Sequence, residues 1–95
     1  MTRPYFKKVQ CTLIRLQFCC KTIEEYNIIK TIRIKINNIK ILLNNINNSN
    51  DDNIDFYYDL QINCNKIYKA INHIKDEQIK QLLYEIVNEL TLTLA

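Results

Sequence analysis

The residues best suited to metal binding or nucleophilic catalysis in this sequence are its four cysteines and its single histidine. A zinc site usually takes paired ligands that are two to four residues apart. Cys19 and Cys20 are adjacent and point in different directions on any regular element, and Cys64 and His73 do not share a helical face. We therefore expect no metal site and no structural disulfide. The thiols are expected to fill space as small hydrophobic groups in a reducing compartment.

No group of residues indicates an active site. His73 lacks a flanking motif that would orient it toward a cysteine nucleophile. The acidic residues of 51–59 cluster where a helix is expected to begin, and the helix dipole accounts for them. The sequence contains no glycine, which excludes a P-loop, a dinucleotide-binding fingerprint and an EF-hand calcium loop. We expect a protein that is not an enzyme, with no cofactor and no evident small-molecule ligand.

Basic residues gather in the first half of the chain. Residues 1–50 contain nine Lys and Arg against two Glu, a balance of +7, whereas residues 51–95 contain four Lys against eight Asp and Glu, a balance of −4. Basic side chains bind phosphates, and nearby aromatic rings can stack on unpaired bases. The candidate nucleic-acid-binding residues are Lys7, Lys8, Arg15, Lys30, Arg33, Lys35 and Lys40. The simpler interpretation is that the two halves attract each other, within one chain or between chains.

The chain has more apolar surface than two helices can bury. Some of its isoleucines fall outside the predicted helix seams, and three consecutive aromatic residues cannot all share one narrow helix face. The candidate partner-binding residues are Ile34, Ile41, Phe56, Tyr57 and Tyr58. We expect a small helical protein-interaction module that binds another protein or itself, with a homodimer as the simplest form. The alternative is a nucleic-acid-binding regulator that uses the basic N-terminal half.

Residues 22–46 are predicted to form a helix. Thr22 and Glu25 fit a capping box, in which each side chain bonds to the backbone amide of the other residue. The apolar residues that follow are spaced alternately three and four positions apart: Ile29, Ile32, Ile36, Ile39, Leu43 and Ile46. The alternative is a β-hairpin, because residues 31–36 alternate strictly and Asn37-Asn38 suits a tight turn. The capping box and the unbroken spacing favour the helix.

The rest of the chain shows similar spacing. Residues 47–53 are rich in Asn, Ser and Asp and are predicted to form a linker. Heptad spacing then predicts a helix over residues 53–75. The apolar phase resets at Asp76, a good N-cap, which predicts a C-terminal helix over residues 76–91, with one long helix as the alternative. The alternating residues 91–95 are expected to fray.

Residues 1–21 are uncertain between helix and strand. Val9, Cys11 and Leu13 alternate with polar residues, as in a strand. On a helical wheel, Val9, Leu13, Leu16 and Cys20 also form a stripe, and Pro4 suits a first helical turn. The helix is favoured because a lone strand would find no sheet.

These elements predict an all-α fold in a single domain, residues 1–95. The expected architecture is a small helical bundle built on an antiparallel helix hairpin (22–46 and 53–75). The C-terminal helix (76–91) is expected to cover the groove between the two helices of the hairpin. A chain of this length buries only about 60% of its unfolded surface, so oligomerisation would add useful apolar burial.

Composition bears on origin and location. The sequence has 17 Ile and 13 Asn but no Gly, which indicates an AT-rich genome and suggests a virus- or phage-encoded accessory protein. No apolar run approaches the roughly 18 residues of a membrane span. Polar residues interrupt the apolar stretch 9–20 and no cleavage pattern follows it, so we expect an intracellular protein, cytoplasmic or, in a eukaryotic host, nuclear. An organellar presequence in the basic first 23 residues is the less favoured alternative.

Overall fold

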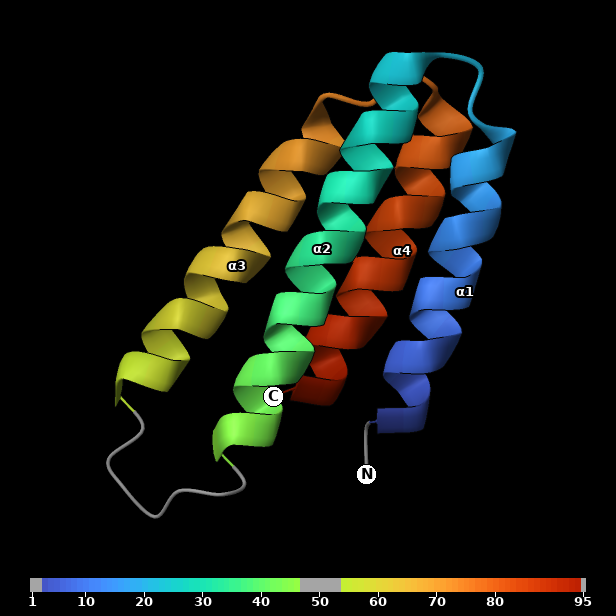
Figure 1. Ribbon diagram of the computed structural model, residues 1–95. Helices are drawn as coiled ribbons and strands as arrows, with labels where there is room; N and C mark the ends of the chain where they lie inside the picture. Colours follow the sequence, from blue (N-terminus) through green and yellow to red (C-terminus); the bar gives the residue numbers. More distant parts are fainter. Residues whose placement is uncertain (1–2, 47–53, 95) are drawn as a thin grey trace.

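The computed structural model describes residues 3–46 and 54–94, and the side chains of residues 6–45 and 58–92. These residues form four helices: α1 (Arg3–Cys19), α2 (Ile23–Ile46), α3 (Ile54–Asn72) and α4 (Glu77–Leu94). Successive helices run in opposite directions along one bundle (Figure 1). The described residues contain no strand, which confirms the all-α prediction. The hairpin alternative for residues 31–43 is wrong, because α2 passes through them without a break.

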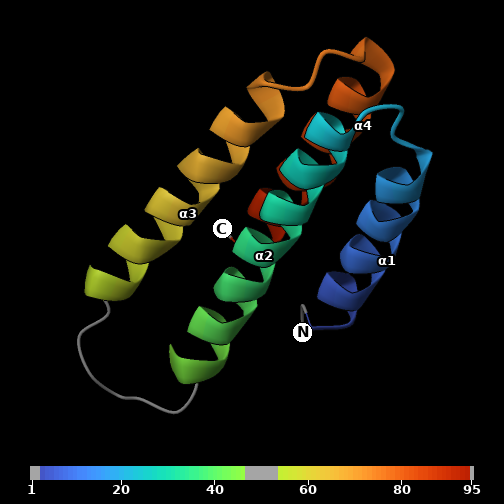
Figure 2. The same cartoon turned by 45° about the horizontal axis from the view of Figure 1, so that its top comes forward.

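The helices pack in a ring. Helix α2 contacts α1 and α3, and α4 contacts α3 and α1. Figure 2 shows α1 and α3 on opposite sides of α2, with α4 behind it. The prediction that the C-terminal helix covers the α2–α3 groove is therefore wrong. Helix α1 also enters the bundle, so α4 packs between α3 and α1 and lies diagonally opposite α2, with the buried side chains of all four helices in one core.

The core follows the apolar spacing of each helix. On α2, the first four predicted seam positions are fully buried, and Leu43, the fifth, is partly buried against the core. The fully buried side chains are Phe6, Leu13, Ile29, Ile32, Ile36, Ile39, Ile67, Ile71, Ile74, Leu83, Val87 and Leu90. Every helix contributes to this set, because each carries an apolar stripe at helical spacing. Helix α1 confirms the helical interpretation of the N-terminal segment, and its Phe6 and Leu13 are buried in the core.

The starts of α2 and α4 are joined by one carboxylate. Thr22 caps α2, since its hydroxyl accepts a hydrogen bond of 3.1 Å from the Glu25 amide. The Glu25 side chain does not complete the predicted capping box. It is only 6% exposed and accepts a 3.2 Å hydrogen bond from the backbone amide of Asp76. Glu25 therefore holds the start of α4 against the start of α2.

The junction between α3 and α4 differs from the predicted boundaries. Helix α3 ends at Asn72, three residues before the predicted end, and the His73 and Ile74 amides bond the carbonyls of Ala70 and Ile71 in a tighter turn. Ile74 is buried although it lies outside the helix. The predicted cap is confirmed, because an Asp76 carboxylate oxygen accepts hydrogen bonds from the amides at positions 78 and 79. The single-helix alternative for residues 53–91 is wrong.

The C-terminal segment is also more regular than expected. Helix α4 continues to Leu94, although the alternating residues 91–95 were expected to fray. Its inner face is anchored by fully buried Leu83, Val87 and Leu90. The stacked rings of Tyr68 and Tyr84, with centroids 6.2 Å apart, join α4 to α3. This packing holds α4 to the bundle from Leu83 to Leu90.

Candidate functional site

The outer face of α2 carries two candidate partner-binding residues. Ile34 and Ile41 are 52% and 48% exposed, on the side of the helix opposite its buried isoleucines. They are seven residues apart, which places them on one stripe with a separation of about 10 Å along the helix axis. Large apolar side chains that remain half exposed at heptad spacing form a small hydrophobic ridge. We call Ile34 and Ile41 the isoleucine ridge.

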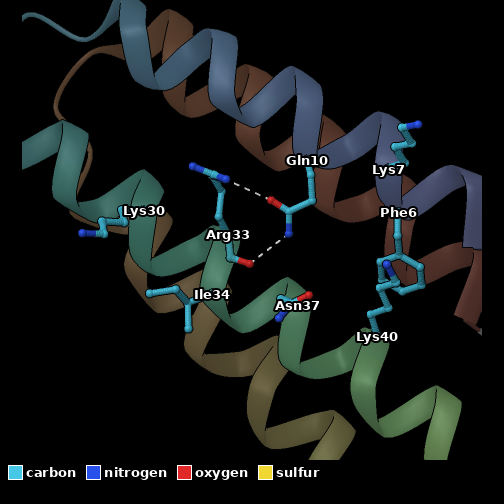
Figure 3. A pocket seen from close by; sticks show the side chains of 8 residues that line it. All are labelled: Phe6, Lys7, Gln10, Lys30, Arg33, Ile34, Asn37 and Lys40. Carbon is cyan, nitrogen blue, oxygen red and sulfur yellow. Dashed lines mark hydrogen bonds between the residues drawn. The ribbon is translucent and has the colours of Figure 1, made fainter.

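A basic groove lies on one side of the ridge, between α1 and α2. It has a volume of about 520 Å³ and is lined by Phe6, Lys7, Gln10, Lys30, Arg33, Ile34, Asn37 and Lys40. Figure 3 shows Lys30 toward one end of the groove and Lys7 and Lys40 toward the other. The described lining contains four cations and no carboxylate. The groove therefore favours an anionic occupant with some apolar surface.

Arg33 is held in the groove by two glutamines of α1. Its Nε donates to Gln10 Oε1 at 3.1 Å, and the Gln10 amide donates to the Arg33 carbonyl at 3.0 Å, a reciprocal pair visible in Figure 3. Its terminal nitrogen donates to Gln17 Oε1 at 2.8 Å. Gln17 is only 4% exposed and also donates to the Tyr26 carbonyl. These amide partners fix Arg33 without neutralising its charge.

The seven candidate nucleic-acid-binding residues do not form one surface. The groove brings together Lys7, Lys30, Arg33 and Lys40. Lys8 and Arg15 are exposed on α1, and Lys35 is half-buried on α2, none of them in the groove lining. The structure thus selects four of the seven predicted residues as neighbours in space.

A second, smaller groove flanks the ridge on its other side, between α2 and α3. Its volume is about 310 Å³, and it is lined by Asn38, Ile41, Leu42, Asp59 and Asn63. Asp59 is exposed, and of the described residues in this lining it is the one that carries a charge. The ridge therefore separates a groove lined by cations from a groove that carries a carboxylate.

The predicted aromatic cluster is described only in part. Tyr58 is 66% exposed on α3 and lines neither groove, so it lies apart from the ridge. The side chains of Phe56 and Tyr57 lie outside the described residues. Sequence reasoning missed other exposed apolar residues around the α1–α2 turn and on α4: Phe18, Ile23, Tyr26, Leu82 and Leu92. Because these residues lie outside the predicted helix seams, their exposure could have been predicted from the sequence.

The thiols of the four cysteines are free. Cys11 and Cys19 are exposed, whereas Cys20 and Cys64 are half-buried. Burial raises the pKa of both half-buried thiols, and for Cys20 the negative charges of Glu25, Cys19 and Asp76 raise the pKa further. In the described part of the chain, no three His, Cys, Asp or Glu side chains gather to hold a metal ion. His73 is exposed at the end of α3.

The chain matches no known family model, no curated protein and no solved structure. Within residues 3–46 and 54–94, none of the helices has the length and apolar character needed to cross a membrane. The candidate functional site is therefore the outer surface of α2 with its two flanking grooves.

Proposed function

We propose that this protein is a non-enzymatic helical interaction module that self-associates through the outer face of α2. One observation supports this proposal most directly: Ile34 and Ile41 remain half exposed at heptad spacing on the outer face of an otherwise well-packed helix. The four-helix core already buries the seam residues, so these two isoleucines add nothing to it. A second helix surface would remove them from water.

Burial of the ridge supplies only part of the free energy that a dimer needs. Full burial of an isoleucine side chain contributes about 1.5–3 kcal/mol, so covering the exposed halves of four isoleucines in a two-fold dimer contributes about 3–6 kcal/mol. Association itself has a cost of at least several kcal/mol. The ridge is therefore necessary for the dimer but not sufficient, and the flanking grooves must add further contacts.

The test replaces the ridge without disturbing the core. The double variant Ile34→Lys/Ile41→Lys should fold normally and lose self-association, because two exposed apolar side chains become charged and hydrated. Sedimentation equilibrium from ten to several hundred micromolar gives the mass, and circular dichroism gives the helical content. A matched control, Ile23→Lys/Leu92→Lys, adds the same charges at apolar residues that are exposed elsewhere.

The control variant should associate as the wild type does. A wild type that stays monomeric up to several hundred micromolar contradicts the proposal. An Ile34→Lys/Ile41→Lys variant that keeps the wild-type dimer also contradicts it, because the ridge would then lie outside the interface.

The clustering of four cations in the basic groove supports a second candidate function, nucleic-acid binding. Phosphates would occupy the groove, and binding would weaken steeply as salt rises because bound counterions are released. Fluorescence anisotropy with single- and double-stranded oligonucleotides tests this. Lys30→Ala/Lys40→Ala should weaken binding and reduce its salt dependence, whereas Lys66→Ala/Lys69→Ala, at exposed lysines of α3, should not. Undetectable binding at low salt would exclude this function.

A further inference from the structure

The linings of the two grooves beside the isoleucine ridge differ in charge. In the groove on the α1 side, the side chains that the structure describes include four cations and no carboxylate. Among the described residues that line the groove on the α3 side, Asp59 is the charged one, and the exposed Lys66 lies on the same helix two turns further along. A surface with a positive side and a negative side is complementary to a rotated copy of itself, provided that the rotation brings unlike sides together.

The direction of the two α2 helices in a dimer decides which sides meet. A two-fold axis parallel to α2 makes the two α2 helices parallel and places the α1 side of one copy against the α3 side of the other. A two-fold axis perpendicular to α2 makes them antiparallel and places α1 against α1. Helix α1 contains four Lys and Arg and no acidic residue, so the antiparallel arrangement brings like charges together. Electrostatics therefore favours the parallel arrangement.

The height of the charged groups along the bundle supports a specific pair. Asp59 lines the α2–α3 groove together with Ile41 and Leu42, so it lies near the level of these residues. Lys40 precedes Ile41 directly and faces the opposite groove. A rotation about an axis parallel to α2 keeps every residue at its own level. Lys40 of one copy would thus meet Asp59 of the other, while each isoleucine of the ridge meets its own counterpart.

We propose that a second copy of this chain docks on the outer face of α2 in a parallel two-fold dimer. In this dimer the Lys40 side of each basic groove faces Asp59 of the other copy. This inference rests on the proposed self-association and adds its orientation and its charge pairing. Each pair occurs twice, so a change at one residue acts at two places in the dimer.

Charge reversal tests the pairing. Lys40→Glu and Asp59→Lys should each weaken the dimer by about three- to tenfold in Kd, because an exposed ion pair is lost twice and replaced by repulsion. The double variant Lys40→Glu/Asp59→Lys should return to within about twofold of the wild type. Added salt should weaken the wild-type dimer and reduce the differences among these variants. Sedimentation gives the Kd values, and circular dichroism verifies folding.

Disulfide trapping tests the orientation. Asn27 is exposed and lies seven residues before Ile34, so it belongs to the same stripe of α2. In a background with the exposed Cys11 and Cys19 replaced by serine, Asn27→Cys should form an interchain disulfide under mild oxidation. In an antiparallel dimer centred between the isoleucines, the two introduced thiols would be about 30 Å apart. Glu85→Cys, on the exposed face of α4, is the control and should not crosslink.

The outcomes separate this inference from the proposed function. If neither Lys40→Glu nor Asp59→Lys weakens the dimer, the charge pairing is wrong but self-association still holds. The same conclusion follows if the double variant dimerises more weakly than either single variant. A dimer in which Asn27→Cys does not crosslink overturns the parallel orientation alone. A monomeric wild type removes the proposed function, and this inference with it.

Discussion

Buried polar side chains hold this small bundle together at specific points. Gln17 and Glu25 are the buried polar residues of the described side chains, and each connects two helices through a backbone or guanidinium partner. A buried polar group without a partner costs free energy, so these contacts specify how the helices meet. Among the described residues that are not exposed, no buried side-chain nitrogen or oxygen atom is left unbonded.

Replacing Glu25 should reveal the value of its contact with α4. Glu25→Leu removes the acceptor of the Asp76 amide, and we expect a loss of about 1–3 kcal/mol in the free energy of unfolding. Glu25→Gln keeps an acceptor oxygen and should lose less. Urea unfolding followed by circular dichroism measures both variants. A leucine variant as stable as the wild type would show that the contact does not stabilise the fold.

The four thiols should differ in reactivity. Cys11 and Cys19 are exposed and should be alkylated first, whereas the half-buried Cys20 and Cys64 should react slowly. Burial raises the pKa of these two thiols, so their thiolates form at higher pH in the folded chain than in urea. Their contribution to stability is complete below the ordinary thiol pKa and is lost as pH rises through the raised values. Mass spectrometry of alkylated peptides, at several pH values with and without urea, measures the alkylation rate of each cysteine. Equal rates for all four cysteines in the folded chain would contradict the prediction.

At the scale of the helices, apolar spacing predicted the buried faces correctly but did not predict where each helix ends. The alternating three- and four-residue steps on α2 identified a continuous helix and its buried face. The same spacing wrongly predicted that α3 continues through Ile74. Ile74 is buried, as the spacing predicts, but the helix ends at Asn72. Periodicity records which side chains face the core, and it does not record how the backbone presents them. Only one of the two hydrogen bonds of the predicted capping box forms, because the Glu25 carboxylate instead accepts a hydrogen bond from the backbone amide of Asp76, which is distant in sequence.

The start of α4 depends on its cap. Asp76 accepts hydrogen bonds of 3.0 and 3.2 Å from the amides of Gln78 and Ile79. Asp76→Ala should lower the free energy of unfolding by about 1 kcal/mol, whereas Asp76→Ser should retain most of it, since serine is also a good N-cap. The Asp76 backbone amide still reaches Glu25 in both variants, so the comparison isolates the cap. Thermal and urea unfolding measure the difference, and equal losses in the two variants would argue against capping.

At the scale of the molecule, the sequence predicted the fold class and named some of the residues that line the candidate site, but it did not predict Asp59, Gln10 or the arrangement of the site. The charges of the first half and the isoleucines outside the seam were both visible in the sequence. Their meeting at one ridge with a basic groove beside it depends on how α1 packs on α2. Gln10 and Gln17 of α1 contribute to that packing through their hydrogen bonds with Arg33, which no local pattern indicates. The N-terminal helix therefore both closes the bundle and forms one wall of the site.

Helix α1 is thus expected to be part of the cooperative fold. Phe6 is 1% exposed in the core, whereas Phe18, on the same helix, is 79% exposed. Phe6→Ala should cost about 3–5 kcal/mol, because it removes a buried ring and leaves a cavity. Phe18→Ala should change stability by less than about 0.5 kcal/mol.

Since small domains have total stabilities of about 5–15 kcal/mol, the Phe6 variant should lie close to the limit of folding. Urea unfolding of both variants measures the free energy and the m-value. If α1 were a loosely attached appendage, Phe6→Ala would leave the main transition unchanged. A large loss with one transition would show that α1 unfolds together with the other three helices, and the basic groove would then exist only in the intact bundle.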